Sequence, residues 1–443
     1  MRKTSLTLFV LLISCLAAAL DKQPNADYHA RRVALSQKIG SGVVVMFAST
    51  EAEGQNNVYG YKPNDDFFYL TGWPEPGAAI VIAPQAAASD GQPARKYTEI
   101  IFLPGHNLSQ ERWTGPKLGP ESPDARTLTG FDRVDTLDHL RDELVKILPQ
   151  PRATVYSDLA GYREQSPATE PLAWLRRANA FPNYIRYEDV KPHLTAMRMV
   201  KDKGEQERIQ HAADASVAAH LAAMRAMKPG VTEREIAALM QYEFEKRGCE
   251  RPAYAPIVGA GFNSTVLHYS EDSGVVKDGD VVVLDVAGEY AGYAADITRT
   301  LPANGKFTAR QREVYDIVLG AQKAAEAAFQ AGKSKLTGSG SLYDVALAYI
   351  NAHGKDMHGA PLGKYFIHGL GHQVGLEVHD ADNRAPLDRG MVFTIEPGIY
   401  IPEEKLGVRI EDMYLVGADG KLVRLTEKLP QTADDVERTM SNR

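Results

Sequence analysis

Residues 281–300, which read VVVLDVAGEYAGYAADITRT, decide the fold of the C-terminal half of this chain. The apolar run before Asp285 and the β-branched residues after Asp296 are typical of two strands of a hairpin. A turn centred on Tyr290 and Ala291 predicts that the two aspartates lie directly opposite, with Cβ atoms about 5 Å apart. Carboxylates so placed repel each other, and burial raises their pKa values. The hairpin therefore predicts one half of a cation site.

A second hairpin, over residues 391–411, repeats this arrangement with glutamates. A turn centred on Glu403 and Glu404 places Glu396 opposite Glu411. Acidic residues at strand ends are usually solvated, and one such pair alone would be a weak signal. Two hairpins of the same design favour a shared metal site over that ordinary interpretation.

A glycine-rich segment with three histidines lies between the hairpins: residues 367–380 read IHGLGHQVGLEVHD. Carboxylate oxygens with one imidazole suit Mn²⁺, and two ions that share carboxylates lie about 3.5–4 Å apart. Such a pair holds a bridging hydroxide and polarises an amide carbonyl, as a two-metal hydrolase requires. The candidate ligands are Asp285, Asp296, His372, Glu396 and Glu411.

These segments resemble the pita-bread metallopeptidases, specifically the branch of aminopeptidase P and prolidase. The strings DITRT (296–300), HGLGH (368–372), EPG (396–398) and RIED (409–412) occur in the order typical of that family. The resemblance implies that the five candidate ligands bind two divalent metal ions, with Mn²⁺ as the expected metal. It also implies an α/β N-terminal domain followed by an α+β pita-bread catalytic domain.

The resemblance implies roles for four residues outside the ligand set. His268 would contact the substrate and steady the tetrahedral intermediate, and His379 would contact the scissile region and transfer a proton. His368 would lie near the proline ring, and Arg409 would support the metal-binding carboxylates. Neutral imidazoles are suitable donors to an oxyanion, and an arginine behind the ligands fixes their orientation. A purely structural place is the alternative for each histidine.

The activity that the resemblance implies is that of an Xaa-Pro aminopeptidase acting on peptides with proline at the second position. A bridging hydroxide would attack the carbonyl before proline, with Glu396 as both metal ligand and base. Prolidase, which cleaves Xaa-Pro dipeptides, is the alternative. It needs a cation for the free carboxylate, and Arg384 is the nearest candidate. A non-hydrolytic binding protein or a metal-free creatinase-like relative is remote, because such relatives lose metal ligands.

Composition agrees with a globular enzyme. The chain has 443 residues, a length typical of two or three domains, and 44% of them are hydrophobic, enough for real cores. Its formal net charge is −7 and its pI is near 6.0. Without a basic run, binding to nucleic acid or to an anionic membrane is not expected.

The N-terminus indicates export. Basic residues 2–3, an apolar stretch over 6–16 and small residues 17–19 predict a cleaved signal peptide over residues 1–19. The mature chain is then expected to lie in the periplasm or outside the cell, with no stable membrane span. A lipobox that makes Cys15 a lipidated N-terminus is the first alternative, and an uncleaved anchor is the second.

The remaining chain is expected to form an N-terminal domain over residues 27–192 and a catalytic domain over 200–435. The strings YKPNDDFFYLTG (61–72) and WTGPKLG (113–119) resemble the N-terminal domain of aminopeptidase P and prolidase. Family members use that domain to cap a neighbouring active site, which implies a homodimer or homotetramer. Periodicity predicts a long helix over residues 203–227.

Capping boxes predict the starts of two more helices of the catalytic half. Thr232 and Glu235 form one such box, and Thr308 and Gln311 form the other.

Overall fold

The structure is a computed structural model that describes residues 21–49, 59–85, 94–96, 98–148, 153–159 and 185–442. The expected signal peptide over residues 1–19, with Cys15, lies outside the described residues. Within the described ranges, no helix combines the length and the apolar character that crossing a bilayer requires.

The N-terminal domain is built on one mixed sheet of six strands in the order β4-β3-β2-β1-β5-β6. Pairs β1–β2 and β2–β3 are antiparallel, whereas β1–β5, β3–β4 and β5–β6 are parallel. The strands are β1 (Val43–Phe47), β2 (Ala79–Ile82), β3 (Glu99–Leu103), β4 (Arg133–Thr136), β5 (Thr154–Ser157) and β6 (Arg186–Asp189). The helices are α1 (Asn25–Ile39), α2 (Asp65–Thr71), α3 (Leu108–Thr114), α4 (Ala125–Thr129) and α5 (Leu140–Ile147). The expected α/β architecture is confirmed.

The two faces of this sheet enter different hydrophobic cores, because side chains alternate along each strand. Val43 and Val45 pack with α5 in a core confined to the N-terminal domain. Val44 and Met46 face the other way, into a core that includes α1 and α2. That second core continues into the C-terminal domain, with the buried side chains of Ile209, Ala287, Tyr293, Ala294, Val374, Leu376, Val392 and Met413. The two domains therefore share one apolar core.

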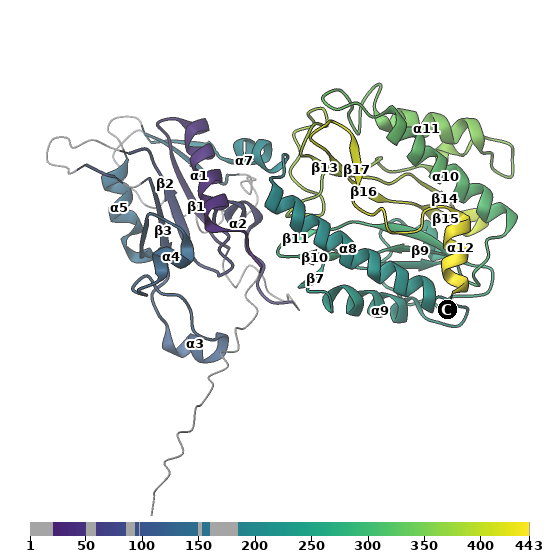
Figure 1. Ribbon diagram of the computed structural model, residues 1–443, viewed down its shortest axis with the longest axis horizontal. Coiled ribbons are helices and arrows are strands. Elements are labelled where there is room, and N and C mark those ends of the chain that lie inside the picture. The colour runs from purple at the N-terminus through teal and green to yellow at the C-terminus, as the bar shows by residue number, and fades with distance from the viewer. Residues whose placement is uncertain are drawn as a thin grey trace, which may run out of the picture.

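Helix α7 (Lys191–Arg198) lies between the domains, and α8 (Lys203–Ala226) runs from their junction across the C-terminal domain (Figure 1). The predicted helix over 203–227 is confirmed, and so are both predicted capping boxes. Asp202 and Glu205 form a third capping box at the start of α8. Figure 1 shows α9 (Glu233–Glu245) beside α8, and α10 (Ala309–Ala328) beside α11 (Leu342–His353), with α12 (Ala433–Ser441) nearby.

Short antiparallel sheets fill the space between these helices, which confirms the α+β class of this domain. Their orders are β12-β9-β8, β11-β10-β7, β13-β16-β17 and β14-β15. The first two sheets contain β7 (Arg251–Pro252), β8 (Ile257–Ala260), β9 (Val281–Asp285), β10 (Gly288–Tyr290), β11 (Tyr293–Ala294) and β12 (Thr298–Pro302). The others contain β13 (Val392–Ile395), β14 (Gly398–Ile401), β15 (Leu406–Arg409), β16 (Asp412–Val416) and β17 (Leu422–Arg424).

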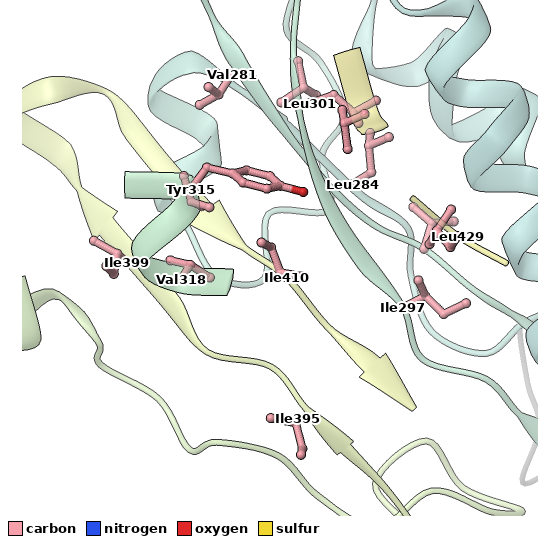
Figure 2. Close-up of a cluster of buried hydrophobic side chains, with 14 of the residues drawn as sticks. Val281, Leu284, Ile297, Leu301, Tyr315, Val318, Ile395, Ile399, Ile410 and Leu429 are labelled. Atoms are coloured by element: carbon pink, nitrogen blue, oxygen red, sulfur yellow. The ribbon is translucent and has the colours of Figure 1, made fainter. Parts of the chain in front are cut away.

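The strands that carry the candidate ligands are fixed from behind by a third core. Figure 2 shows Val281 and Leu284 of β9, Ile399 of β14, and Tyr315 and Val318 of α10 within this cluster of buried side chains. Apolar side chains of these strands pack into this core, and the acidic residues at the strand ends lie outside it.

Candidate metal centre

The aspartate hairpin has a register different from the predicted one. Its turn is centred on Ala291 and Gly292, because Tyr290 pairs with Tyr293, and Asp285 consequently pairs with Thr298. The prediction that Asp285 lies directly opposite Asp296 is therefore wrong by two residues. An even shift keeps a side chain on the same face of the ladder, so the two aspartates still face one site.

Backbone conformation explains this turn. Ala291 and Gly292 both have positive φ, at 52° and 83°. A two-residue hairpin turn of type I′ needs positive φ at both central positions, which usually selects Asn-Gly or Asp-Gly. Because an alanine occupies the first central position, the sequence did not indicate this turn.

The glutamate hairpin has the predicted register. Ile395 pairs with Asp412, and Gly398 pairs with Arg409, so the ladder on both sides places Glu396 opposite Glu411. A bridge between Thr298 and Glu411 joins this hairpin to the aspartate hairpin. The Thr298 hydroxyl donates to Glu411 Oε2 at 2.7 Å.

Every residue predicted for the site lines one cavity of about 300 Å³. It contains the five candidate ligands together with His268, His368, His379 and Arg409. Arg384, the candidate cation of a prolidase, is exposed and lies outside the residues that line this cavity.

Three of the candidate ligands already have the spacing of a metal site. Ligand atoms of Asp296, His372 and Glu411 lie within 4.8 Å of one another. His372 Nε2 lies 3.3 Å from Asp296 Oδ2 and 3.4 Å from Glu396 Oε1. Its Nδ1 contacts the carbonyl of Gln373 at 3.1 Å, which directs Nε2 towards the carboxylates. Burial alone would lower the pKa of His372, but Asp296 and Glu396 outweigh it and raise that pKa to about 9.

The positive charges of His372 and Arg409 do not offset the burial of Glu396 and Glu411. Burial, with the repulsion of Asp296, raises the pKa of Glu396 to about 7 and that of Glu411 well above its ordinary value. Asp285 Oδ1 and Glu411 Oε1 are buried and have no hydrogen-bond partner in the described part of the chain. Partnerless carboxylate oxygens that face one cavity fit a divalent cation.

Arg409 connects one candidate ligand to the far side of the cavity. Its Nη2 donates to Asp285 Oδ2 at 2.6 Å, and its Nη1 donates to the Tyr400 hydroxyl at 2.7 Å. Tyr400 Oη lies 2.9 Å from His368 Nε2, and His368 Nδ1 lies 2.8 Å from the carbonyl of Gly369. Burial and the charge of Arg409 lower the pKa of His368 to about 4. His368 is therefore neutral near pH 7, and its Nε2 accepts a hydrogen bond from the Tyr400 hydroxyl.

The sequence pattern did not single out two tyrosines beside the site, Tyr254 and Tyr400, because a tyrosine in an apolar stretch is more often part of a core. Tyr400 shares a strand line with Glu396 at an even spacing, which places both side chains on one face and was a usable signal. Tyr254 lines an adjoining cavity of about 280 Å³ with Asp285, Asp296 and His379. Burial and the charge of Asp285 raise the pKa of Tyr254 well above its ordinary value.

Two further histidines border the cavity. The ring of His379 lies against that of His372, with centroids 4.0 Å apart. Burial and the charge of His372 lower the pKa of His379, which favours the neutral ring. His268 is exposed and lines both cavities from the segment that follows the short helix η3 (Gly261–Thr265).

The chain resembles known proteins over almost its whole length. Metallopeptidase family M24 matches residues 207–418, and the Aminopeptidase P, N-terminal domain matches residues 28–156. The chain is 30% identical to Xaa-Pro aminopeptidase of Escherichia coli (strain K12), over 94% of this chain and 97% of that protein. It is 38% identical to Xaa-Pro dipeptidase of Pyrococcus furiosus, but over only 56% of this chain and 69% of that protein. The solved structure of proline aminopeptidase P II from Yersinia pestis superimposes with a TM-score of 0.79 at 31% identity, covering 95% of this chain and all (100%) of that chain.

Proposed function

Because the chain belongs to metallopeptidase family M24, with the N-terminal domain of aminopeptidase P before a pita-bread catalytic domain, we propose that this metallo-aminopeptidase is an Xaa-Pro aminopeptidase. It would hydrolyse the bond between an N-terminal residue and a following proline. The observation that carries the proposal is the convergence of four carboxylates and His372 on one cavity. The match to Xaa-Pro aminopeptidase of Escherichia coli over both domains supports this substrate class.

We propose that Asp285, Asp296, His372, Glu396 and Glu411 hold two divalent metal ions, with Mn²⁺ as the expected metal. Oxygen donors with one imidazole are the ligands that Mn²⁺ prefers. The partnerless oxygens of Asp285 and Glu411 support this assignment, because a bound cation would satisfy both. Two such ions supply Lewis-acid polarisation of the carbonyl and a hydroxide nucleophile at neutral pH.

The protein's own side chains would handle the protons and the developing charge. Glu396 would take a proton from the nucleophile and pass it to the imino nitrogen of the leaving proline. His379 and His268, on the cavity wall, would donate to the carbonyl oxygens of the substrate. Arg409 would hold Asp285 through its 2.6 Å contact.

His368 lines the part of the cavity that we assign to the proline ring, and Tyr400 contacts His368. His368 is held on one nitrogen by the Gly369 carbonyl and on the other by Tyr400, so its ring is fixed. A fixed, neutral ring suits a substrate group that has no N–H to donate.

Assembly and export remain proposals. Helix α3 buries none of its side chains, and it exposes Trp113 (89%) and Leu108 (73%). We propose that the exposed Trp113 lies at the interface of a homodimer or homotetramer. The N-terminal pattern over residues 1–19 supports export.

The test is hydrolysis of Ala-Pro-Ala and of Ala-Pro by the Mn²⁺-loaded protein without residues 1–19. We expect alanine release from the tripeptide, loss of that activity in Glu396→Ala, and retention in Glu403→Ala, a control at the exposed turn of the same hairpin. Cleavage of the dipeptide alone would make the protein a prolidase. Silence on both peptides would refute the proline assignment.

A further inference from the structure

Glu233, the first residue of α9, is a buried carboxylate that the proposed reaction does not use. Its side chain is fully buried, and burying an ionised carboxylate is costly unless hydrogen bonds satisfy it. Four groups do so: the backbone N–H groups of Ala260 and Gly274, the Asn263 amide and the Tyr269 hydroxyl. None of these donors is a basic side chain. The Glu233 carboxylate therefore acts as a hydrogen-bond acceptor for the groups around it.

The four donors lie along one segment, residues 260–274. Glu233 Oε1 accepts from Ala260 at 2.8 Å and from Asn263 at 2.9 Å, near the start of the segment. Oε2 accepts from Tyr269 at 2.8 Å and from Gly274 at the end of the segment. A Cβ on Gly274 would come within 2.7 Å of Oε2, so a larger residue here would displace the carboxylate. Glu233 thus ties both ends and the middle of the segment to α9.

The residue held in the middle is the neighbour of His268. Tyr269 is buried, with 8% exposure, whereas His268 is exposed and faces the metal centre. The Tyr269 hydroxyl also accepts from the backbone N–H of Ser273 at 3.0 Å. His268 therefore extends from a solvent-facing segment whose adjacent side chain is fixed by a buried carboxylate.

We propose that Glu233 and Tyr269 are positioning residues that hold His268 at the metal centre. The inference rests on the proposed function, in which His268 contacts the substrate. A catalytic group displaced by about 1 Å loses up to about 100-fold in rate. Replacing Tyr269 by phenylalanine keeps the ring in place and removes the hydrogen bond of its hydroxyl to Glu233, which we call the anchor.

The test compares Tyr269→Phe with Tyr315→Phe. Tyr315 is fully buried in the same domain (Figure 2), and its hydroxyl donates to the Gln431 carbonyl at 2.9 Å. Both variants lose one buried tyrosine hydroxyl, but only one loses a contact in the His268 segment. We expect kcat/KM on Ala-Pro-Ala to fall about tenfold in Tyr269→Phe and to stay within about twofold in Tyr315→Phe. An equal loss in both variants would overturn the proposal.

A double-mutant cycle tests whether the effect passes through His268. If it does, Tyr269→Phe costs nothing further in a His268→Ala background. The same tenfold loss in both backgrounds would show that Tyr269 acts independently of His268 and would overturn the inference.

A measurement without substrate separates this inference from the proposed function. The measurement is the NMR signal of the His268 ring in histidine-labelled protein, assigned by its loss in His268→Ala. This signal should shift or broaden in Tyr269→Phe and in Glu233→Gln. It should stay unchanged in Tyr315→Phe. If the wild type does not hydrolyse Ala-Pro-Ala but the signal moves as expected, the proposed function fails and the anchor stands. A signal that is unchanged in Tyr269→Phe would overturn the anchor whatever the activity.

Discussion

Replacing Arg198 by methionine should lower the free energy of unfolding by about 3–5 kcal/mol, the usual effect of removing one partner from a buried ion pair. Arg198, at the end of α7, is 3% exposed and joins the two domains. Its Nη1 lies 2.7 Å from Asp66 Oδ1 in the N-terminal domain, and its Nη2 lies 2.5 Å from Asp380 Oδ1 in the C-terminal domain. Lys201 Nζ also reaches Asp380, at 3.0 Å, but Asp66 has no other basic partner among the described residues. The variant therefore leaves one buried carboxylate unpaired.

The effect should depend on pH. Burial alone would raise the pKa of Asp380, but the charges of Lys201 and Arg198 outweigh it and hold that pKa below its usual value. A carboxyl group with a lowered pKa stabilises the fold above its unfolded pKa, near 3.9, and loses this contribution as the pH falls through the folded value. The part of the difference between wild type and Arg198→Met that comes from Asp380 should therefore be full at pH 7 and shrink below about pH 4.

Urea unfolding followed by circular dichroism at pH 7 and at lower pH measures both effects. Lys428→Met is the control, because it removes an exposed ion pair with Asp214, and it should leave the stability unchanged within error. A loss of less than about 1 kcal/mol in Arg198→Met at pH 7 would refute the reasoning, because it would mean that the junction tolerates an unpaired carboxylate.

Three further predictions concern the site and the assembly. Because the metal-free pKa of Glu396 is raised to about 7, the metal-free protein should lose stability as the pH rises from about 4.5 to 7, and Mn²⁺ should remove this loss. Thermal unfolding with and without Mn²⁺ measures it, and identical pH slopes would contradict it. Tyr400→Phe removes the hydroxyl that hydrogen-bonds to both Arg409 and His368, and it should lower kcat/KM at least about tenfold. Unchanged kinetics would show that these two hydrogen bonds do not contribute to the reaction. Trp113→Glu should shift the protein to smaller species in light scattering after size exclusion, whereas an unchanged mass would place the interface elsewhere.

Local patterns predicted the register of a hairpin where the lengths of its strands and turn were sufficient to define it. The glutamate register could be predicted, because the distance between Glu396 and Glu411 along the chain leaves little freedom for a hairpin that pairs both flanks. The aspartate register was wrong by two residues, because the turn places an alanine at positive φ, where sequence statistics expect asparagine or aspartate. Asp285 and Asp296 still lie on one face of the ladder, since an even shift preserves the face.

Contacts between distant segments could not be predicted from single positions. Tyr400 acquires its place only when β14 and β15 bring its hydroxyl to Arg409 and residue 368 comes in from a separate segment. Glu233 lies in the first turn of a helix, where acidic residues are common, and the four groups that donate to its carboxylate lie up to 41 residues away along the chain. Such contacts depend on tertiary structure, and composition and periodicity do not predict them.

The core shared by the two domains has a consequence for the order in which the chain is made. The last strand of the N-terminal sheet ends at Asp189, but Val392 and Met413, which complete that core, follow more than 200 residues later. At about 5–20 residues per second, synthesis of the intervening residues takes about 10 to 45 seconds. During that time the apolar face that contains Val44 and Met46 lacks part of its core. Slowing translation between the two domains should therefore increase aggregation of the nascent chain.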